Sequence, residues 1–375
     1  MAKARSTVAR VGVIVNPIAG MGGTVALHGT DGDASEQARA LGALPGSEER
    51  MQRALAVLKR EHPAALEIVA AAGSMGENSV RASGLTISHT VGTASESTSA
   101  ADTRAAATAL RDADVDVILF AGGDGTAADI VGEVGTAVTV LGTPSGVKMH
   151  SGVFARTPER AGEIAAEFLA AGERRLSQET EVLDVAPGEQ ELSDIGVARV
   201  PRASAGVQGP KVARADNTDA EIQSLGAQIA AAMTVGVSYI LGPGTTVGSI
   251  FGALGLEGTR NGFDIVLNGA IVATDASEGV LFEHVVTHPG SVLVLGVVGG
   301  QGFLLGRGNQ QISPRVLSEI DEADIVIVAA QNKIDALQPP QLHVDLGQTE
   351  PHTALHGYRR VRTSPTRSTV LRITN

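Results

Sequence analysis

The chain has 375 residues, of which 43% are apolar and 2% are aromatic, and its formal net charge is −12. This length and apolar content suffice for two domains with buried cores and exclude a wholly disordered chain. The acidic balance and the lack of Trp argue against a nucleic-acid partner, because such partners are bound by basic and stacking side chains.

The lack of Cys excludes disulfide scaffolds, thiolate zinc sites and thiol nucleophiles. No apolar run reaches the length of a membrane span, and the first residues carry no signal-peptide cleavage pattern. We therefore expect a cytoplasmic protein without a membrane partner.

Apolar strands alternate with helical segments in the first half of the chain. The patterns predict strands at 11–15, 66–70, 115–121 and 138–141. They predict helices at 47–60, from Ser99 to Arg111, directly after residue 126, and near 158–171. This alternation is typical of a parallel α/β domain.

The second half begins differently. Residues 178–215 show Thr/Val alternation and scattered turns, which predict a few antiparallel strands. From about residue 218 helices and strands alternate again, and the tail beyond Gln341 has the pattern of short strands. We therefore expect an N-terminal α/β domain at 1–177. A C-terminal domain at 178–375 is expected to have a small β-rich start, a second α/β region and a short-strand tail.

Glycines cluster where the predicted strands end. The chain has 46 of them, and five glycine-rich loops follow strands. The carboxyl ends of parallel strands are where ligands bind in open α/β sheets, and glycines there free backbone N–H groups for an anion. The loops therefore predict phosphate binding; the alternative is that each glycine only permits a tight turn. Candidate binding glycines are Gly20, Gly22, Gly146 and Gly244.

One loop carries more chemistry than the others. Gly122, Gly123, Asp124, Gly125 and Thr126 follow the clearest strand. Asp124 is suited to deprotonate a hydroxyl or to hold Mg²⁺, and Thr126 to donate to a phosphate oxygen, which is what phosphoryl transfer requires. The alternative is that Asp124 only caps the next helix. No Gly precedes a Lys, so the loop is not of the Walker A type.

The sequence GGDGT resembles the signature of the NAD kinase/diacylglycerol kinase/phosphofructokinase-like superfamily. Further segments are similar to its ATP-NAD kinase-like branch, which includes the acetoin-catabolism protein X group. These segments are NPIAGMGG (16–23), HGTDG (28–32), LGTPSGVKMHSGVFA (141–155), YILGPGTT (239–246) and GGQGFLLGRGNQQISP (299–314). The similarity extends from about residue 10 to 335.

The resemblance implies a kinase that phosphorylates NAD, using ATP or polyphosphate with Mg²⁺. In NAD kinases the Asp of GGDGT is the base for the adenosine-ribose 2′-hydroxyl, which gives that role to Asp124. Asn16 and the surrounding glycines would line the site of the donor phosphates. Lys148, His150 and Ser151 would contact NAD. Related kinases are often homo-oligomers, and the partners implied are small nucleotides.

The chain has further candidate binding residues, and it differs from the family pattern in two respects. Asp31, Thr245, Arg307 and Asn309 are candidate nucleotide-binding residues in glycine-rich loops. The usual second motif for the nicotinamide half has no clear equivalent, and position 128 is Ala where this branch typically has a basic residue. A kinase for another small hydroxylated metabolite, or a non-catalytic sensor of NAD or ATP, are the alternatives. The Arg-rich end of the chain is expected to be a solvated edge strand or a partner contact, with phosphate binding as the alternative. Its arginines are Arg359, Arg360, Arg362, Arg367 and Arg372.

Overall fold

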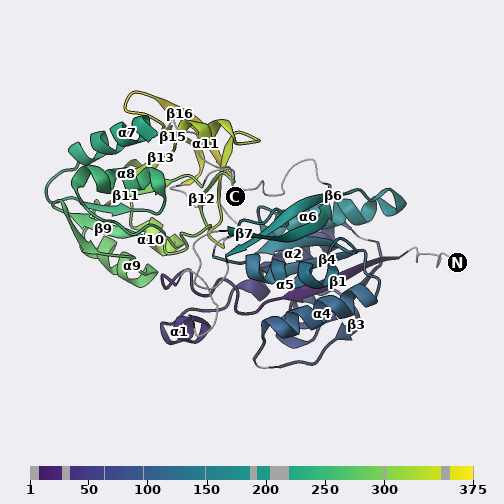
Figure 1. Cartoon of the computed structure of the whole chain (residues 1–375). Helices are drawn as coiled ribbons and strands as arrows, with labels where there is room; N and C mark the ends of the chain where they lie inside the picture. Colours follow the sequence, from purple (N-terminus) through teal and green to yellow (C-terminus); the bar gives the residue numbers. More distant parts are fainter. Residues whose placement is uncertain are drawn as a thin grey trace. The chain divides into compact units, whose positions relative to one another are not determined.

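The computed structural model describes residues 8–27, 34–62, 64–95, 97–147, 149–185, 192–202, 219–298, 301–347 and 355–374. The chain divides into two compact units, here called the first and second unit (Figure 1). The first unit contains residues 1–20 and 44–210, and the second contains residues 21–43 and 211–375.

The described strands of the first unit form a seven-stranded sheet in the order β3-β2-β1-β4-β5-β7-β6. Their bounds are β1 (Ala9–Val15), β2 (Leu66–Ala71), β3 (Ile87–Val91), β4 (Val117–Gly122), β5 (Thr139–Pro144), β6 (Ser177–Val185) and β7 (Leu192–Pro201). All neighbouring strands are parallel except β6 and β7, which form an antiparallel hairpin. The strand order reverses between β1 and β4, so their ends form the topological switch point of the sheet.

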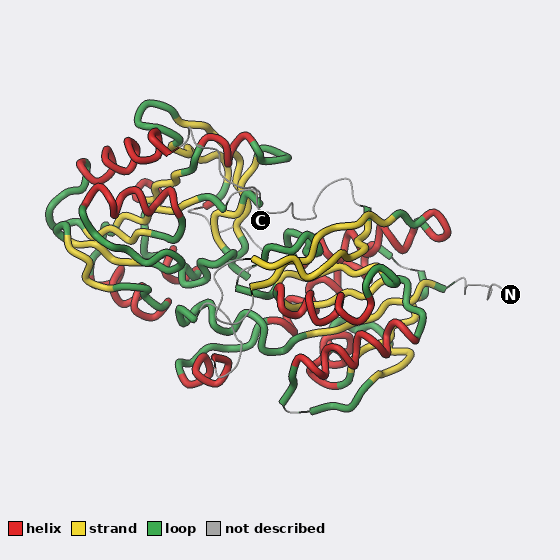
Figure 2. Tube along the Cα trace, in the orientation of Figure 1, coloured by secondary structure: helices red, strands yellow, loops and turns green. Residues whose placement is uncertain are grey.

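Helices cover both faces of this sheet, because its central strands are apolar on both sides (Figure 2). The elements are α2 (Ser47–Glu61), η1 (Gly73–Met75), α3 (Glu77–Ala82), α4 (Ala100–Asp112), α5 (Asp124–Val134), α6 (Pro158–Ala170) and η2 (Gly172–Arg174). Apolar residues of α2 and α6 pack on one face, and those of α4 and α5 pack on the other.

The β6–β7 hairpin confirms the antiparallel strands that we expected after residue 177, but it adds to the edge of the first sheet. Thr139 on β5 pairs with Arg199 on β7, and the hairpin packs on α5 through Val182, Ala198 and Val200. The expected boundary at 177/178 therefore separates the hairpin from the sheet that it extends.

The second unit contains a nine-stranded mixed sheet in the order β10-β9-β8-β11-β13-β15-β16-β14-β12, counted over the described residues. Its strands are β8 (Ser238–Leu241), β9 (Asp264–Leu267), β10 (Ala270–Ala273), β11 (Val292–Gly296), β12 (Phe303–Leu305), β13 (Ile325–Val328), β14 (Gln341–Val344), β15 (Gly357–Arg362) and β16 (Ser368–Thr374). The four strands β8, β11, β13 and β15 are parallel neighbours.

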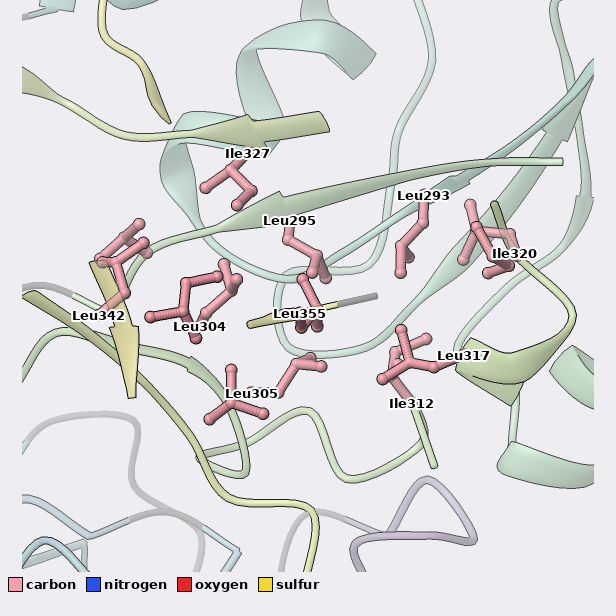
Figure 3. Close-up of a cluster of buried hydrophobic side chains, with 14 of the residues drawn as sticks. Leu293, Leu295, Leu304, Leu305, Ile312, Leu317, Ile320, Ile327, Leu342 and Leu355 are labelled. Carbon is pink, nitrogen blue, oxygen red and sulfur yellow. The ribbon is translucent and has the colours of Figure 1, made fainter. Parts of the chain in front are cut away.

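Helices cover this second sheet as well. Those with residues in its apolar clusters are α7 (Asp219–Ala231), α8 (Thr245–Leu254), α9 (Glu278–Thr287), α10 (Pro314–Ser318) and α11 (Gln331–Asp335). The second unit also contains α1 (Ala34–Ala40) and η4 (Glu322–Asp324). One face carries a core to which β11, β12 and β13 contribute Leu295, Leu304 and Ile327 (Figure 3). Leu225 and Ile250, on α7 and α8, pack on the other face. The expected fold class, two α/β regions with mostly parallel sheets, is thus confirmed.

The segment after β1 passes from the first unit into the second. The Thr24 carbonyl accepts a hydrogen bond of 2.9 Å from the backbone N–H of Glu278 at the start of α9, and residues 21–43 group with the second unit. No helix among the described residues is long and apolar enough to cross a membrane.

Candidate active site

Three loops of the first unit converge at the carboxyl ends of β1, β4 and β5. The Asn16 side-chain amide, after β1, donates to Thr126 Oγ1 at 3.0 Å, which joins the loops on either side of the switch point. The Asn16 backbone N–H also donates to the Ala121 carbonyl at 2.9 Å. The backbone N–H groups of Ser145 and Gly146, after β5, both donate to the Gly122 carbonyl at 3.0 Å.

Glycines permit this close approach. A Cβ on Gly20, whose φ is +79°, would lie 2.0 Å from the Ser145 carbonyl oxygen. A Cβ on Gly122 would lie 2.4 Å from Thr126 Cβ. A side chain at Gly20 would displace the Ser145 backbone, and one at Gly122 would displace the Thr126 side chain, so packing favours glycine at both positions.

Asp124 lies at the first position of α5, directly after the N-cap Gly123, and is 7% exposed. Its Oδ1 accepts from the Ser151 backbone N–H at 3.0 Å and from Ser151 Oγ at 2.7 Å. Its Oδ2 accepts from the His150 backbone N–H at 2.6 Å and lies 3.0 Å from His150 Nδ1. The helix N-terminus favours the negative charge at this place.

The segment that supplies these donors is held by the hairpin. Ser151 Oγ accepts from the Leu183 backbone N–H on β6 at 3.0 Å, and Gly152 N–H donates to the Glu181 carbonyl at 3.1 Å. At its far end the segment returns to β5, where Phe154 pairs with Gly142. The hairpin thus fixes the position of His150 and Ser151 relative to Asp124.

Two family comparisons identify the chain. Residues 11–173 match the ATP-NAD kinase N-terminal domain, and residues 236–373 match the ATP-NAD kinase C-terminal domain. The chain belongs to the ATP-NAD kinase family.

No curated protein matches the chain in sequence. Among solved structures it is similar to one described as "Crystal structure of UDP-N-acetylglucosamine 2-epimerase", with 12% identity and a TM-score of 0.21. The similarity covers 36% of this chain and 33% of that one, so the chain spans about a third of that protein's length. A likeness of this size carries no argument about fold or activity.

The ATP-NAD kinase N-terminal domain brings most of the candidate residues together. Those that lie at the three converging loops are Asn16, Gly20, Gly122, Gly123, Asp124, Gly125, Thr126, Gly146, His150 and Ser151. Lys148 and Asp31 lie outside the described residues. Gly22 belongs to the second unit.

The candidate residues within the C-terminal domain lie in two different environments, one exposed and one buried. Gly244 is the N-cap of α8, with φ +107°, and Thr245 follows it at the exposed start of that helix. Arg307 is instead buried: its guanidinium lies 3.2 Å from Asp345 Oδ2 and 4.1 Å from the centre of the Phe303 ring. Asn309 Oδ1 accepts from the Gly306 N–H at 2.7 Å, and its amide donates to the Leu304 carbonyl at 2.8 Å. Both side chains therefore hold their own loop.

The Arg-rich end also makes contacts within the second unit. Arg359 forms an ion pair with Glu322 at 2.7 Å, and Arg367 forms one with Glu221 on α7. Arg362 donates to the Gln228 side chain, also on α7. The expected edge strand is wrong, because β15 and β16 each have a neighbouring strand on both sides. At least these three arginines bond to neighbouring elements of the second unit.

Sequence reasoning missed two residues near the converging loops. Thr143 is fully buried near the end of β5, and its Oγ1 has no hydrogen-bond partner among the described residues. Asp184 Oδ2, on β6, lies 3.7 Å from the position of a Cβ on Gly125. A Thr in a strand and an Asp in an alternating segment carry no signal of this placement, because it depends on how the hairpin folds back.

The magnesium ion that the family implies does not fit at Asp124 in this arrangement. A carboxylate ligand must offer oxygen lone pairs to the metal, and Asp124 already accepts from the backbone N–H groups of His150 and Ser151 and lies 3.0 Å from His150 Nδ1. The Ser151 hydroxyl is shared between Asp124 Oδ1 and the Leu183 carbonyl. No group of three or more His, Asp or Glu side chains suited to a metal occurs in the described parts of the chain. We therefore derive no step through a metal held by Asp124.

Proposed function

We propose that the chain transfers a phosphoryl group from ATP or polyphosphate to the 2′-hydroxyl of NAD, with proton removal centred on Asp124. The observation that carries this proposal is a buried carboxylate at the point where the loops after three adjacent parallel strands meet. Membership of the ATP-NAD kinase family supports the choice of NAD as acceptor.

The converging loops are suited to bind the phosphate groups of the donor. Phosphoryl transfer depends mainly on positioning and on stabilising negative charge. Gly123, Gly125 and Thr126 lie in the first turn of α5 or just before it, where backbone N–H groups and the helix dipole favour phosphate oxygens. Gly244 and Thr245 offer a similar helix start in the second unit and are proposed to contribute to nucleotide binding.

The test is a coupled assay. The purified protein is incubated with NAD, Mg²⁺ and either ATP or polyphosphate, and NADP is detected with an NADP-specific dehydrogenase. We expect NADP to form with at least one donor, and Asp124→Asn to lower kcat about 100-fold or more, because an amide neither accepts a proton nor orients a base. Circular dichroism checks that the variant remains folded.

Two results of this assay would contradict parts of the proposal. Turnover of Asp124→Asn at the wild-type rate would overturn the role of Asp124. No NADP with either donor, while calorimetry still detects nucleotide binding, would favour another hydroxylated acceptor or a sensor without catalysis. An exact-mass search for phosphorylated products in metabolite extracts then separates these two alternatives.

A further inference from the structure

We propose that Ser47 and Arg50, in the first turn of α2, are positioning residues for the donor: they hold the loops after β1 and β5 at the spacing that binds its phosphates. This inference rests on the proposed kinase function and deepens it, because it assigns the geometry of the phosphate loops to side chains that lie outside them. It is carried by hydrogen bonds from these two side chains to the backbone carbonyls of Ala19 and Pro144.

Ser47 anchors the loop after β1. Its side chain is fully buried, and its Oγ donates to the Ala19 carbonyl at 2.9 Å. A serine at the beginning of a helix commonly caps it by accepting from a backbone N–H of the first turn. Here the N-cap is Gly46, and no side chain caps the helix. The Ser47 hydroxyl therefore holds the loop, and its removal would take this support away.

Arg50 anchors the end of β5. It follows Ser47 by three positions, so both side chains leave the same side of α2. Arg50 Nε donates to the carbonyl of Pro144, the last residue of β5. Because the N–H groups of a guanidinium have fixed directions, this bond sets the position of the strand end against the helix. One turn of α2 thus holds both loops where they begin to approach each other.

The two anchored carbonyls lie directly before the place where the loops touch. Gly20 follows Ala19, Ser145 follows Pro144, and a Cβ on Gly20 would lie 2.0 Å from the Ser145 carbonyl oxygen. In the same loop the Ala19 N–H donates to the Asn16 carbonyl at 3.2 Å. A shift of either anchored carbonyl would therefore separate the loops and move Asn16, which is a candidate for binding the donor phosphates.

The helix α2 is itself held in place independently of the loops. Its residues Met51, Leu55 and Leu58 are fully buried in the apolar cluster that also contains residues of β1 and β4. On another side, Ser79 Oγ of α3 donates to the Glu48 carbonyl at 3.2 Å. The first turn of α2 is thus a fixed support, and the loops take their positions from it.

Ser47→Ala removes the first anchor without adding bulk. We expect the KM for the donor to rise about tenfold, the effect of one lost hydrogen bond, because the donor must then order the loop as it binds. We expect kcat to stay within about threefold of the wild type, since the reacting groups are unchanged. Ser79→Ala is the matched control: it removes another fully buried serine that donates to a carbonyl, yet it should keep the wild-type KM.

Substitutions at Arg50 test the second anchor. Arg50→Met keeps the apolar stem and removes the donors, so we expect the donor KM to rise about tenfold. In Arg50→Lys the ammonium can still donate to the Pro144 carbonyl, and the rise should be about threefold or less. Arg53→Met is the control for this pair. Arg53 lies three positions further along α2 and pairs with Glu159 of α6 at 2.7 Å, away from the loops.

A purely structural role would give a different pattern. If Ser47→Ala lowers the urea midpoint as Ser79→Ala does but leaves the donor KM unchanged, the proposal is overturned. An equal rise in KM in the variants and in their controls would also overturn it. If the wild type forms NADP under these results, the kinase function stands and only this inference fails. If the wild type forms no NADP, the kinase function fails, and hydrogen exchange decides whether Ser47 holds the loop.

Hydrogen exchange measured by mass spectrometry does not depend on turnover. The backbone N–H groups of Asn16 and Ala19 donate to the carbonyls of Ala121 and Asn16. We expect peptides that cover residues 16–20 to exchange about tenfold faster in Ser47→Ala than in the wild type, and at the wild-type rate in Ser79→Ala. Equal exchange in Ser47→Ala and the wild type would show that the hydroxyl does not hold this loop and would overturn the inference.

Discussion

At the scale of single residues, His284 makes the stability of the second unit depend on pH. Its Nε2 lies 2.6 Å from Ser238 Oγ, and its ring stacks on His288 with the ring centres 4.2 Å apart. Burial lowers the pKa of His284, and the neighbouring His288 lowers it further. The unfolded chain therefore binds a proton at His284 more readily than the folded protein does.

The sign of the effect follows from this difference. A lowered pKa contributes stability that is present above the unfolded value of about 6.5 and is lost as the pH falls below it. We expect the urea midpoint of the wild type to fall between about pH 7 and pH 5, and the fall to be smaller in His284→Gln, which can still bond Ser238 without titrating. Equal pH dependence of the two proteins would contradict this account.

The limits of sequence reasoning are also visible at single residues. The pattern after β4 predicted a functional carboxylate at a strand end. The structure places Asp124 at the first position of α5, directly after that strand, and its function stays a prediction. Its partners His150 and Ser151 follow it by 26 and 27 positions. The family resemblance proposed both as contacts to NAD but not as partners of Asp124, because that pairing depends on the return of the segment to β5 and on the hairpin beyond it.

At the scale of elements, the predicted helices and strands with strong apolar periodicity were correct, whereas short elements in glycine-rich segments were not predicted. Strands and helices with strong apolar periodicity, such as β4 and α2, were found at the expected positions. Short elements beside glycines were not predicted: α3 lies between Gly76 and Gly84, and β12 lies in the loop after β11. Local composition there favours a loop, and pairing with β14 makes residues 303–305 a strand.

A substitution at Gly20 tests the convergence of these loops. In Gly20→Ala the new Cβ would lie 2.0 Å from the Ser145 carbonyl oxygen, and the positive φ adds backbone strain. We expect the free energy of unfolding to fall by about 1–3 kcal/mol and nucleotide binding to weaken, because the loops after β1 and β5 must separate. Urea unfolding and calorimetry measure the two effects.

Gly132→Ala is the matched control for that substitution. Gly132 lies within α5 on its exposed side, and a Cβ there meets no atom within 4 Å. Alanine in an exposed helix should raise the free energy of unfolding by about 0.5–1 kcal/mol. If both variants change stability in the same direction, the contact between Gly20 and Ser145 is not what constrains the loop.

At the scale of the whole molecule, each unit has its own buried core. The first unit contains two apolar clusters around its sheet, and the second contains two others. The chain has no Trp and two Tyr, and Tyr239 and Tyr358 both belong to the second unit. Tyrosine fluorescence therefore reports unfolding of the second unit alone, whereas far-ultraviolet circular dichroism reports both units.

The substitution Arg307→Met tests whether the two units unfold separately, because tyrosine fluorescence reports only the second unit and circular dichroism reports both. Arg307 and Asp345 are each 3% exposed at their side chains, and removing one partner of a buried ion pair costs about 3–5 kcal/mol. We expect the tyrosine transition in urea to move to lower concentration, while circular dichroism resolves a later step that stays at its wild-type position, because the first unit retains its core. If both probes shift together by the same amount, the two cores unfold as one cooperative unit. If neither shifts, the ion pair does not stabilise the loop, and Arg307 becomes available again as a phosphate ligand.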